Sequence, residues 1–295
     1  MIVLPFIKMH GCGNDYVFVD GLAWTAGEFQ HVDFSEVARH ISDRHRGVGS
    51  DGLVLMLPAD GIADAWMKMF NADGSEGALC GNALRCMAMW LHQSGHCGAT
   101  CRIEIRDRMI DAEVLSSDPA TRTATVRIDI GKPVVVSPDA GGLTKYVRPV
   151  ELTDVSMNGQ PLQLWNVSMG NPHAIILADD VESLDLSKIG PQVECHPKFP
   201  DRTNVEFVQI TGRNGAIVRV WERGSGETQA CGSGACASAV MGWACNIFAP
   251  GQPVQIHMPG GDLIVRMTAD DLISLEGPAE ESFRGEIRWT KAMEG

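Results

Sequence analysis

Short alternating runs of apolar and polar residues dominate the chain and predict many strands but few helices. In the first half, this pattern predicts strands at 1–10, 16–19, 53–57, 65–70, 102–105, 109–115 and 124–130. In the second half, it predicts strands at 162–167, 174–177, 216–221, 254–258, 263–267 and 272–275, followed by a tail from residue 277. Helical spacing occurs at 32–45, 83–93, 183–193 and 233–247. Because 83–93 is apolar nearly all round, we expect that helix to be buried.

The two halves share landmarks in the same order, which predicts an internal duplication. Gly13-Asn14 in the first half corresponds to Gly170-Asn171 in the second, and Cys80-Gly-Asn corresponds to Cys231-Gly-Ser. The period is far too long for a solenoid. We therefore expect an α+β fold of two pseudo-symmetric domains, residues 1–130 and 131–276. Each domain is predicted to have a mostly antiparallel sheet curled around a central helix, with a site between the two.

Composition narrows the class of protein. The net charge of −13 argues against a nucleic-acid-binding or anionic-membrane surface. Nine irregularly spaced cysteines in a chain of 295 residues indicate reduced thiols. The short apolar start lacks the basic region of a signal peptide, and no segment approaches a membrane span of about 20 residues. The sequence predicts a soluble cytoplasmic protein.

Two cysteines, Cys80 and Cys231, lie in glycine-rich turns that lead into apolar helices. A helix N-terminus favours a thiolate, so we expect the pKa of each thiol to be lowered toward neutral pH. Two facing thiols suit a reaction that inverts a stereocentre, because one removes a proton and the other delivers one to the opposite face. The backbone N–H groups that follow each cysteine could bind the carboxylate next to the carbanion. They belong to Gly81, Asn82, Gly232 and Ser233.

Other motifs have alternative explanations. The run Gly47–Gly52 fits a dinucleotide fingerprint, but a helix precedes it and a strand follows, so we interpret it as a loop. The set His92, His96, Cys97 and Cys101 matches no established zinc spacing, so no metal site is expected. Cys80 and Cys231 could instead be a redox pair, although no Cys-X-X-Cys occurs.

The polar residues of the turns are also open to two interpretations. His173 is either a base that supports the site or a surface histidine. The pair Glu222–Arg223 is either a surface ion pair or contains an arginine that binds a substrate carboxylate. Asparagine is common in turns for backbone reasons alone. The turn asparagines are Asn14, Asn71, Asn171 and Asn204.

Several long motifs together resemble the diaminopimelate epimerase family, which works without pyridoxal phosphate. The resemblance runs from Phe6 to about Ala279. It rests on the segments Lys8-Met-His-Gly-Cys-Gly-Asn-Asp-Tyr, Phe70-Asn-Ala-Asp-Gly-Ser-Glu, Cys80-Gly-Asn, Ser168-Met-Gly-Asn-Pro-His, Arg202-Thr-Asn-Val-Glu-Phe and Glu222-Arg-Gly-Ser-Gly-Glu-Thr-Gln-Ala-Cys-Gly-Ser-Gly-Ala. One departure is Ala83, where the family usually has glycine. If that position needs a positive φ, the start of the first buried helix is altered.

The resemblance implies a fold, a reaction and a set of site residues. It implies that the C-terminal segment 277–295 returns to the first domain, and that the protein is a homodimer acting on a small amino-acid substrate without a cofactor. Cys80 and Cys231 would be the acid/base thiols, supported by His173 and Glu222. The turn asparagines, Glu222 and Arg223 would bind substrate, with Arg223 at the distal end. The implied reaction converts LL- to meso-2,6-diaminopimelate for lysine and peptidoglycan precursors. Alternatives are a racemase of another amino acid, such as histidine, and a non-catalytic small-molecule or redox-sensing protein.

Overall fold

The computed structural model describes residues 2–25, 29, 31–77, 80–106 and 108–290. The chain forms two compact units, Met1–Ile128 with Gly277–Gly295, and Asp129–Glu276. This division lies two residues before the predicted one at 130/131. Among the described residues, no helix combines the length and apolar composition that crossing a bilayer requires.

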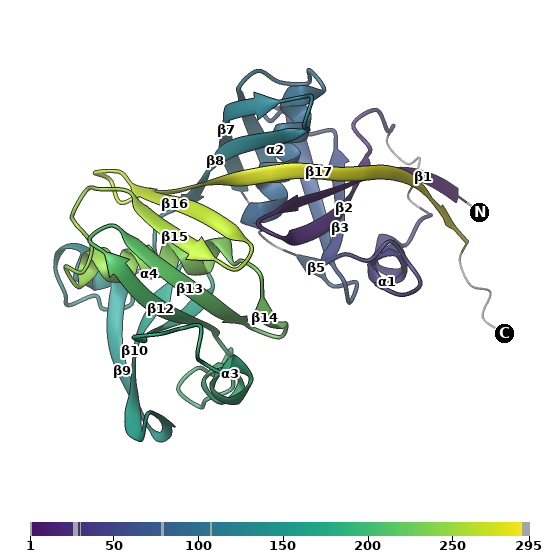
Figure 1. The fold of residues 1–295 in the computed structure, drawn as a ribbon. Coiled ribbons are helices and arrows are strands. Elements are labelled where there is room, and N and C mark those ends of the chain that lie inside the picture. The colour runs from purple at the N-terminus through teal and green to yellow at the C-terminus, as the bar shows by residue number, and fades with distance from the viewer. Residues whose placement is uncertain (1, 26–28, 30, 78–79, 107, 291–295) are drawn as a thin grey trace. The chain divides into compact units, whose positions relative to one another are not determined.

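The first unit is a closed ring of eight strands around one helix (Figure 1). The ring runs β1–β2–β3–β4–β6–β7–β8–β17 and returns to β1. All neighbours with a described register are antiparallel except the parallel pairs β2–β3 and β4–β6. The strands are β1 (Ile2–Gly11), β2 (Asn14–Asp20), β3 (Gly52–Leu57), β4 (Ala65–Asn71), β6 (Thr100–Ile105), β7 (Arg108–Asp118), β8 (Thr123–Gly131) and β17 (Ile273–Trp289), with the short β5 (Glu76–Gly77) beside β4.

Helix α2 (Gly81–Gln93) lies in the core of this unit, with ten consecutive buried residues from Asn82 to Leu91. It packs against β1, β2, β6 and β7. Helix α1 (Phe34–Ser42) packs against β3 and β4 and is amphipathic, with Val37, Ala38 and Ile41 in the apolar cluster it covers. Asp33 caps α1 by accepting hydrogen bonds from the N–H groups of its first turn.

The second unit repeats this arrangement around helix α4 (Gly232–Ala244). Its strands pair in the order β9–β10–β11–β12–β13–β15–β16–β17, with β14 beside β13, and the parallel pairs are β11–β12 and β13–β15. The elements are β9 (Val147–Met157), β10 (Gln160–Ser168), β11 (Pro172–Leu177), β12 (Asn204–Gly212), β13 (Gly215–Glu222), β14 (Gly226–Thr228), β15 (Val254–Met258), β16 (Gly261–Met267), α3 (Leu186–Glu194) and the 3₁₀ helix η1 (Gly142–Tyr146).

The two units therefore share one topology. Each has two parallel pairs at matching places and a buried helix of 13 residues that follows a short strand. Helix α4 is apolar on all sides, as expected for a helix packed against strands from β9 to β16. The predicted fold class, two pseudo-symmetric domains of sheet around a central helix, is confirmed.

The structure of the C-terminal segment differs from the one that the residue pattern predicts. The sequence predicts a strand at 272–275 and a tail from Gly277, but β17 is one strand of 17 residues from Ile273 to Trp289. Its start pairs with β16 and the rest with β1 and β8, so it belongs to both units. The sequence Gly277-Pro278 is typical of a strand end, but the strand continues because β1 and β8 supply hydrogen-bonding partners beyond it. Strand β9 was not predicted from the residues.

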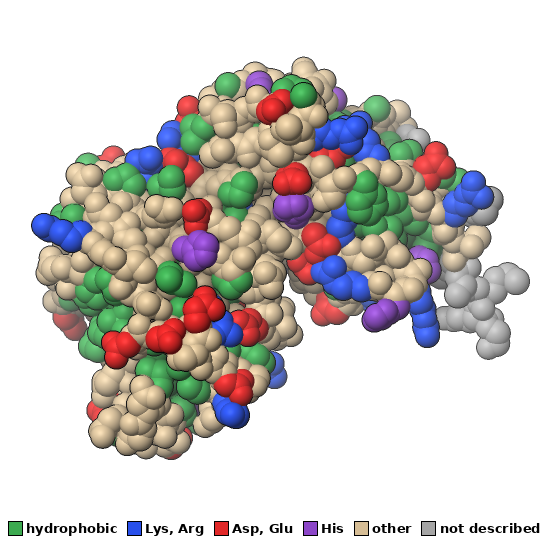
Figure 2. Space-filling model, in the orientation of Figure 1, with side chains coloured by type: hydrophobic (Ala, Val, Ile, Leu, Met, Phe, Trp, Pro, Cys, Tyr) green, Lys and Arg blue, Asp and Glu red, His purple; other side chains and the backbone are tan. Residues whose placement is uncertain are grey.

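The distribution of basic side chains on the surface is consistent with the net charge of −13. On the face that Figure 2 shows, lysine and arginine side chains occur singly or in small groups, and the described residues form no continuous basic patch there.

Candidate active site

Cys80 occupies the N-cap of α2, as predicted. Its backbone is extended, with φ −134° and ψ 109°, and its half-buried sulfur accepts a hydrogen bond from the N–H of Ala83 at 3.4 Å. The Tyr16 hydroxyl lies 3.0 Å from the sulfur. Ala83 has no positive φ and is fully buried in the first turn, so the alanine does not alter the helix start.

Asn82 and Arg85 fix the first turn of α2 from inside the unit. Both are buried, and an Arg85 Nη2–H donates to Asn82 Oδ1 at 2.7 Å. Arg85 also donates to the carbonyl of Pro278 at 3.2 Å and to the Cys12 sulfur at 3.7 Å. The backbone of Gly11 packs so closely that an added Cβ would lie 3.0 Å from the guanidinium. Sequence reasoning missed Arg85, because it treated the helix as apolar.

The asparagines of the first unit lie at the same edge of its barrel. Asn14 begins β2 and Asn71 ends β4, while β3 begins between them at Gly52. Asn71 is held by its side chain, which donates to Ser75 Oγ at 2.9 Å. The contact between Tyr16 of β2 and Cys80 places the N-terminus of α2 at this edge too.

The second unit brings its predicted site residues to the matching edge. Asn204 begins β12 beside His173 of β11, and Glu222 ends β13. Asn204 accepts a hydrogen bond from the Arg223 N–H at 3.0 Å. Cys231 occupies the N-cap of α4, with φ −125° and ψ 108°, and Ser233 Oγ lies 3.5 Å from its sulfur.

The environment of Cys231 has the opposite effect from the one predicted. Its sulfur accepts no capping hydrogen bond within the usual geometry. Burial, followed by the charges of Glu222 and Glu206, raises the pKa of the Cys231 thiol well above its ordinary value. Contacts with Ser233 and the N–H of Gly234 lower that pKa, but less. The helix N-terminus alone suggested a thiolate; two nearby carboxylates and a dry environment favour the thiol instead.

A chain of polar side chains, buried at its Glu206–His173 end, leads to this thiol. Glu206 Oε1 lies 2.7 Å from His173 Nδ1, and His173 Nε2 lies 3.1 Å from Asn171 Oδ1. Asn171 donates to Ser233 Oγ at 3.3 Å, and Ser233 contacts Cys231. His173 and Glu206 are both fully buried, so the interpretation of His173 as a surface residue is wrong.

Sequence reasoning also missed Glu206. The only available signal was a glutamate inside an apolar strand, in Val205-Glu-Phe-Val. Its Oε2 is buried with no hydrogen-bond partner among the described residues. Burial likewise raises the pKa of Glu222, whose carboxylate accepts a hydrogen bond from Thr228. Two carboxylates thus lie near one thiol.

Arg223 differs from the other predicted residues because its side chain is exposed. Its guanidinium donates to the carbonyl of Asp201 at 3.1 Å. Within the described ranges, Glu222 forms no ion pair with Arg223, so a Glu222–Arg223 surface pair is not what the structure contains. The arginine is anchored by its backbone to Asn204 and has donors left for a ligand.

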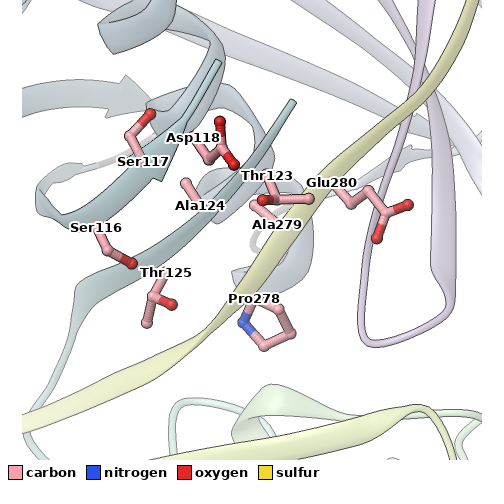
Figure 3. Close-up of a pocket in the computed structure, with 9 residues that line it drawn as sticks. All are labelled: Ser116, Ser117, Asp118, Thr123, Ala124, Thr125, Pro278, Ala279 and Glu280. Carbon is pink, nitrogen blue, oxygen red and sulfur yellow. The ribbon is translucent and has the colours of Figure 1, made fainter. Parts of the chain in front are cut away.

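Other chemistry-bearing residues lie apart from these edges. A pocket of about 350 Å³ in the first unit is lined by β7, β8 and β17 and contains none of the predicted site residues (Figure 3). His92 and His96 bond to Gly98 and Ser94, and no group of three or more potential metal ligands occurs in the described ranges. All nine cysteines are free thiols.

Comparisons with known proteins show the family of the chain. The sequence pattern of the family described as "Diaminopimelate epimerase" matches residues 6–136 and 165–281. The chain is 38% identical to diaminopimelate epimerase of Desulfitobacterium hafniense (96% of this chain, 97% of the relative). It is 40% identical to that of Pelotomaculum thermopropionicum (96% and 98%). A solved structure of a probable proline racemase from Agrobacterium radiobacter shares the fold, with a TM-score of 0.68 at 14% identity (98% and 94%). The resemblance inferred from the motifs is confirmed, and the chain belongs to the diaminopimelate epimerase family.

Proposed function

We propose that this protein epimerises LL-2,6-diaminopimelate to meso-2,6-diaminopimelate without a cofactor, in lysine and peptidoglycan precursor biosynthesis. The observation that carries the proposal is the matched pair of thiols. In a chain of this family, Cys80 and Cys231 each cap the buried central helix of one unit, at the edge where that unit's asparagines gather.

The proposed mechanism needs one proton acceptor and one proton donor on opposite faces of the α-carbon. A thiolate removes the α-proton, so the C–H bond breaks as an S–H bond forms. The opposing thiol then gives its proton to the other face of the carbanion and becomes a thiolate. Cys80 and Cys231 take these roles, and no electrons leave or enter the system.

The carbanion is stabilised through the carboxylate next to it. We assign this to the N–H groups of Gly81 and Asn82 on one side and of Gly232 and Ser233 on the other. One well-placed donor stabilises developing negative charge by about 3 kcal/mol. The helix N-termini add favourable electrostatics for an anion.

The remaining polar residues recognise the rest of the substrate. We propose that Arg223 binds the distal carboxylate and that Glu222 binds a substrate amino group besides supporting Cys231. His173, held by Glu206, supports the thiols. The asparagines at the two barrel edges, Asn14, Asn71, Asn171 and Asn204, bind the substrate's polar groups.

We further propose that the functional halves are residues 1–130 with 277–295 and residues 131–276. The proposed assembly is a cytoplasmic homodimer that needs neither nucleic acid nor membrane. Nine free thiols fit a reducing compartment. Light scattering of the purified protein tests the dimer.

A deuterium assay tests the reaction. Purified protein is incubated with LL-diaminopimelate in D2O without pyridoxal phosphate. The products are separated by chiral chromatography, and their deuterium content is measured by mass spectrometry. The expected result is meso product with deuterium at the inverted α-carbon. Absence of both the meso product and deuterium exchange at the α-carbon would refute the proposal. Equal turnover of a monocarboxylic amino acid, with Arg223→Met having no effect, would indicate a different racemase.

A further inference from the structure

Arg85 is a buried cation that forms no ion pair with a carboxylate among the described residues. Its side chain is fully buried, and the three groups that accept hydrogen bonds from it are an amide, a backbone carbonyl and the sulfur of Cys12. Its Nη1 is buried and has no hydrogen-bond partner among the described residues. An uncompensated buried charge is unfavourable, so a stable fold retains one only where something offsets it.

The position of Arg85 points to the Cys80 turn. A helical side chain leans toward the helix N-terminus, and the bond to Asn82 shows that this guanidinium does so. It therefore lies behind the turn that Cys80 caps. At that turn, the Cys80 sulfur accepts from the Ala83 N–H and contacts the Tyr16 hydroxyl, which can also donate. Donors and a cation together favour a thiolate.

The other titratable groups around this turn do not reverse that charge. On β1, on β2, in the turn between them and in the first turns of α2, these groups are Lys8, His10, Cys12, Asp15, Tyr16 and Cys86. Lys8 forms an ion pair with Asp15, and His10 lies 3.8 Å from Glu280. Burial raises the pKa of Cys86 to about 12, so it is neutral at physiological pH. Glu280 is half-exposed at the end of its pair with His10, where water screens it.

The matching turn of the second unit carries the opposite charge. Cys236 replaces Arg85, and Glu206 packs on the first turn of α4, where its Oε2 has no partner among the described residues. Glu222 adds a second carboxylate. One turn thus has a buried cation beside it, and the other has the buried carboxylate of Glu206 and the half-buried carboxylate of Glu222.

We propose that Arg85 is a positioning residue that holds the Cys80 turn as the proton-accepting side before substrate binds, while Glu206 and Glu222 hold Cys231 as the proton-donating side. This inference rests on the proposed function, because the proton-accepting and proton-donating sides are those of the proposed epimerisation. Each turnover leaves the two thiols with exchanged protonation states, so the enzyme must return a proton to Cys231 and remove one from Cys80. The Arg85 cation and the two carboxylates drive this return.

Alkylation of the substrate-free enzyme tests the inference. Iodoacetamide modification of the Cys80 and Cys231 peptides is followed by mass spectrometry from acidic to alkaline pH, and the midpoint of each pH–rate profile is compared. Midpoints are compared because the rates themselves also depend on burial. In the wild type, we expect the Cys80 midpoint to lie at least about one pH unit below that of Cys231. A Cys80 midpoint equal to or above that of Cys231 would overturn the proposal without any variant.

Substitutions then isolate Arg85. Arg85→Met should raise the Cys80 midpoint by about one pH unit or more, leave the Cys231 midpoint in place, and be rescued in part by Arg85→Lys. Arg102→Met is the control, because it removes a cation of the same unit from an exposed pair with Asp111. An unchanged Cys80 midpoint in a folded Arg85→Met protein contradicts the inference, as does an equal shift in Arg102→Met. No diaminopimelate is used, so failure here is separate from failure of the proposed reaction.

Discussion

The turns that contain Cys80 and Cys231 share a backbone conformation but differ in the side chains around them. In both, a cysteine with nearly the same φ and ψ caps a helix of 13 residues. The residues at matching positions differ, however. Tyr16 corresponds to His173, Val54 to Glu206, Ala83 to Gly234 and Arg85 to Cys236. The first sulfur contacts the Ala83 N–H and the Tyr16 hydroxyl, and the helix that it caps carries a buried cation. The second sulfur lies near the carboxylates of Glu206 and Glu222. A duplicated frame can thus supply two identical groups, while a few buried substitutions give them different surroundings.

Removing either thiol is the most severe test of this comparison. Cys80→Ala and Cys231→Ala should each lower kcat for epimerisation by about 10³-fold, since a positioned acid or base contributes about 10²–10⁴-fold. Chiral chromatography of the products measures the loss. Circular dichroism serves as the control for folding. Full activity in either variant would show that the two turns are not partners.

The glycine and alanine at matching positions offer a stability test. An added Cβ at Gly234 would lie 2.6 Å from Glu206 Oε1, and Glu206 cannot withdraw without losing its 2.7 Å contact with His173. We expect Gly234→Ala to destabilise the protein by about 2–3 kcal/mol through overpacking. Urea unfolding measures the change.

The matched control is the reverse substitution in the first unit. Ala83→Gly should cost only about 1 kcal/mol, because it removes a methyl group from a helix and creates no clash. If Ala83→Gly proves as damaging as Gly234→Ala, the difference between the turns does not arise from Glu206.

The carboxylates near Cys231 predict a pH effect. Because their charges raise the pKa of this thiol, Glu206→Gln should lower it, by about one unit. Alkylation of Cys231 should then begin at lower pH than in the wild type, while Cys80 stays unchanged. Glu227→Gln is the control, since that glutamate pairs with Arg219 at the surface. A midpoint for Cys231 that moves upward in Glu206→Gln would contradict this account.

The Tyr16 contact predicts the smallest effect. Tyr16→Phe removes one hydrogen bond to the Cys80 sulfur, for which about 1 kcal/mol is typical, or roughly fivefold in kcat/KM. The loss should depend on pH, with the variant recovering as the pH rises, because the hydroxyl favours the thiolate. A pH profile of kcat/KM measures it. A pH-independent loss would indicate that Tyr16 only packs.

The sequence predicted much of this protein because its signals are local. Alternation placed the strands, and the apolar run from Ala83 to Gln93 indicated a buried helix. The Cys-Gly pairs marked both helix starts at Cys80 and Cys231. These features depend on neighbours within a few residues, and the duplicated order then implied two similar units.

Tertiary structure decided what local signals cannot contain. Whether Gly277-Pro278 ends a strand depends on β1 and β8, which supply ladder partners from distant parts of the chain. The charges of Arg85 and Glu206 look like ordinary polar interruptions in sequence, and only packing shows that both are buried. The helix N-terminus by itself predicted a thiolate at Cys231. The protonation of a thiol depends on burial and on all nearby charges. The fold buries Cys231 and places Glu206 and Glu222 near it, so the pKa of this thiol is raised and not lowered.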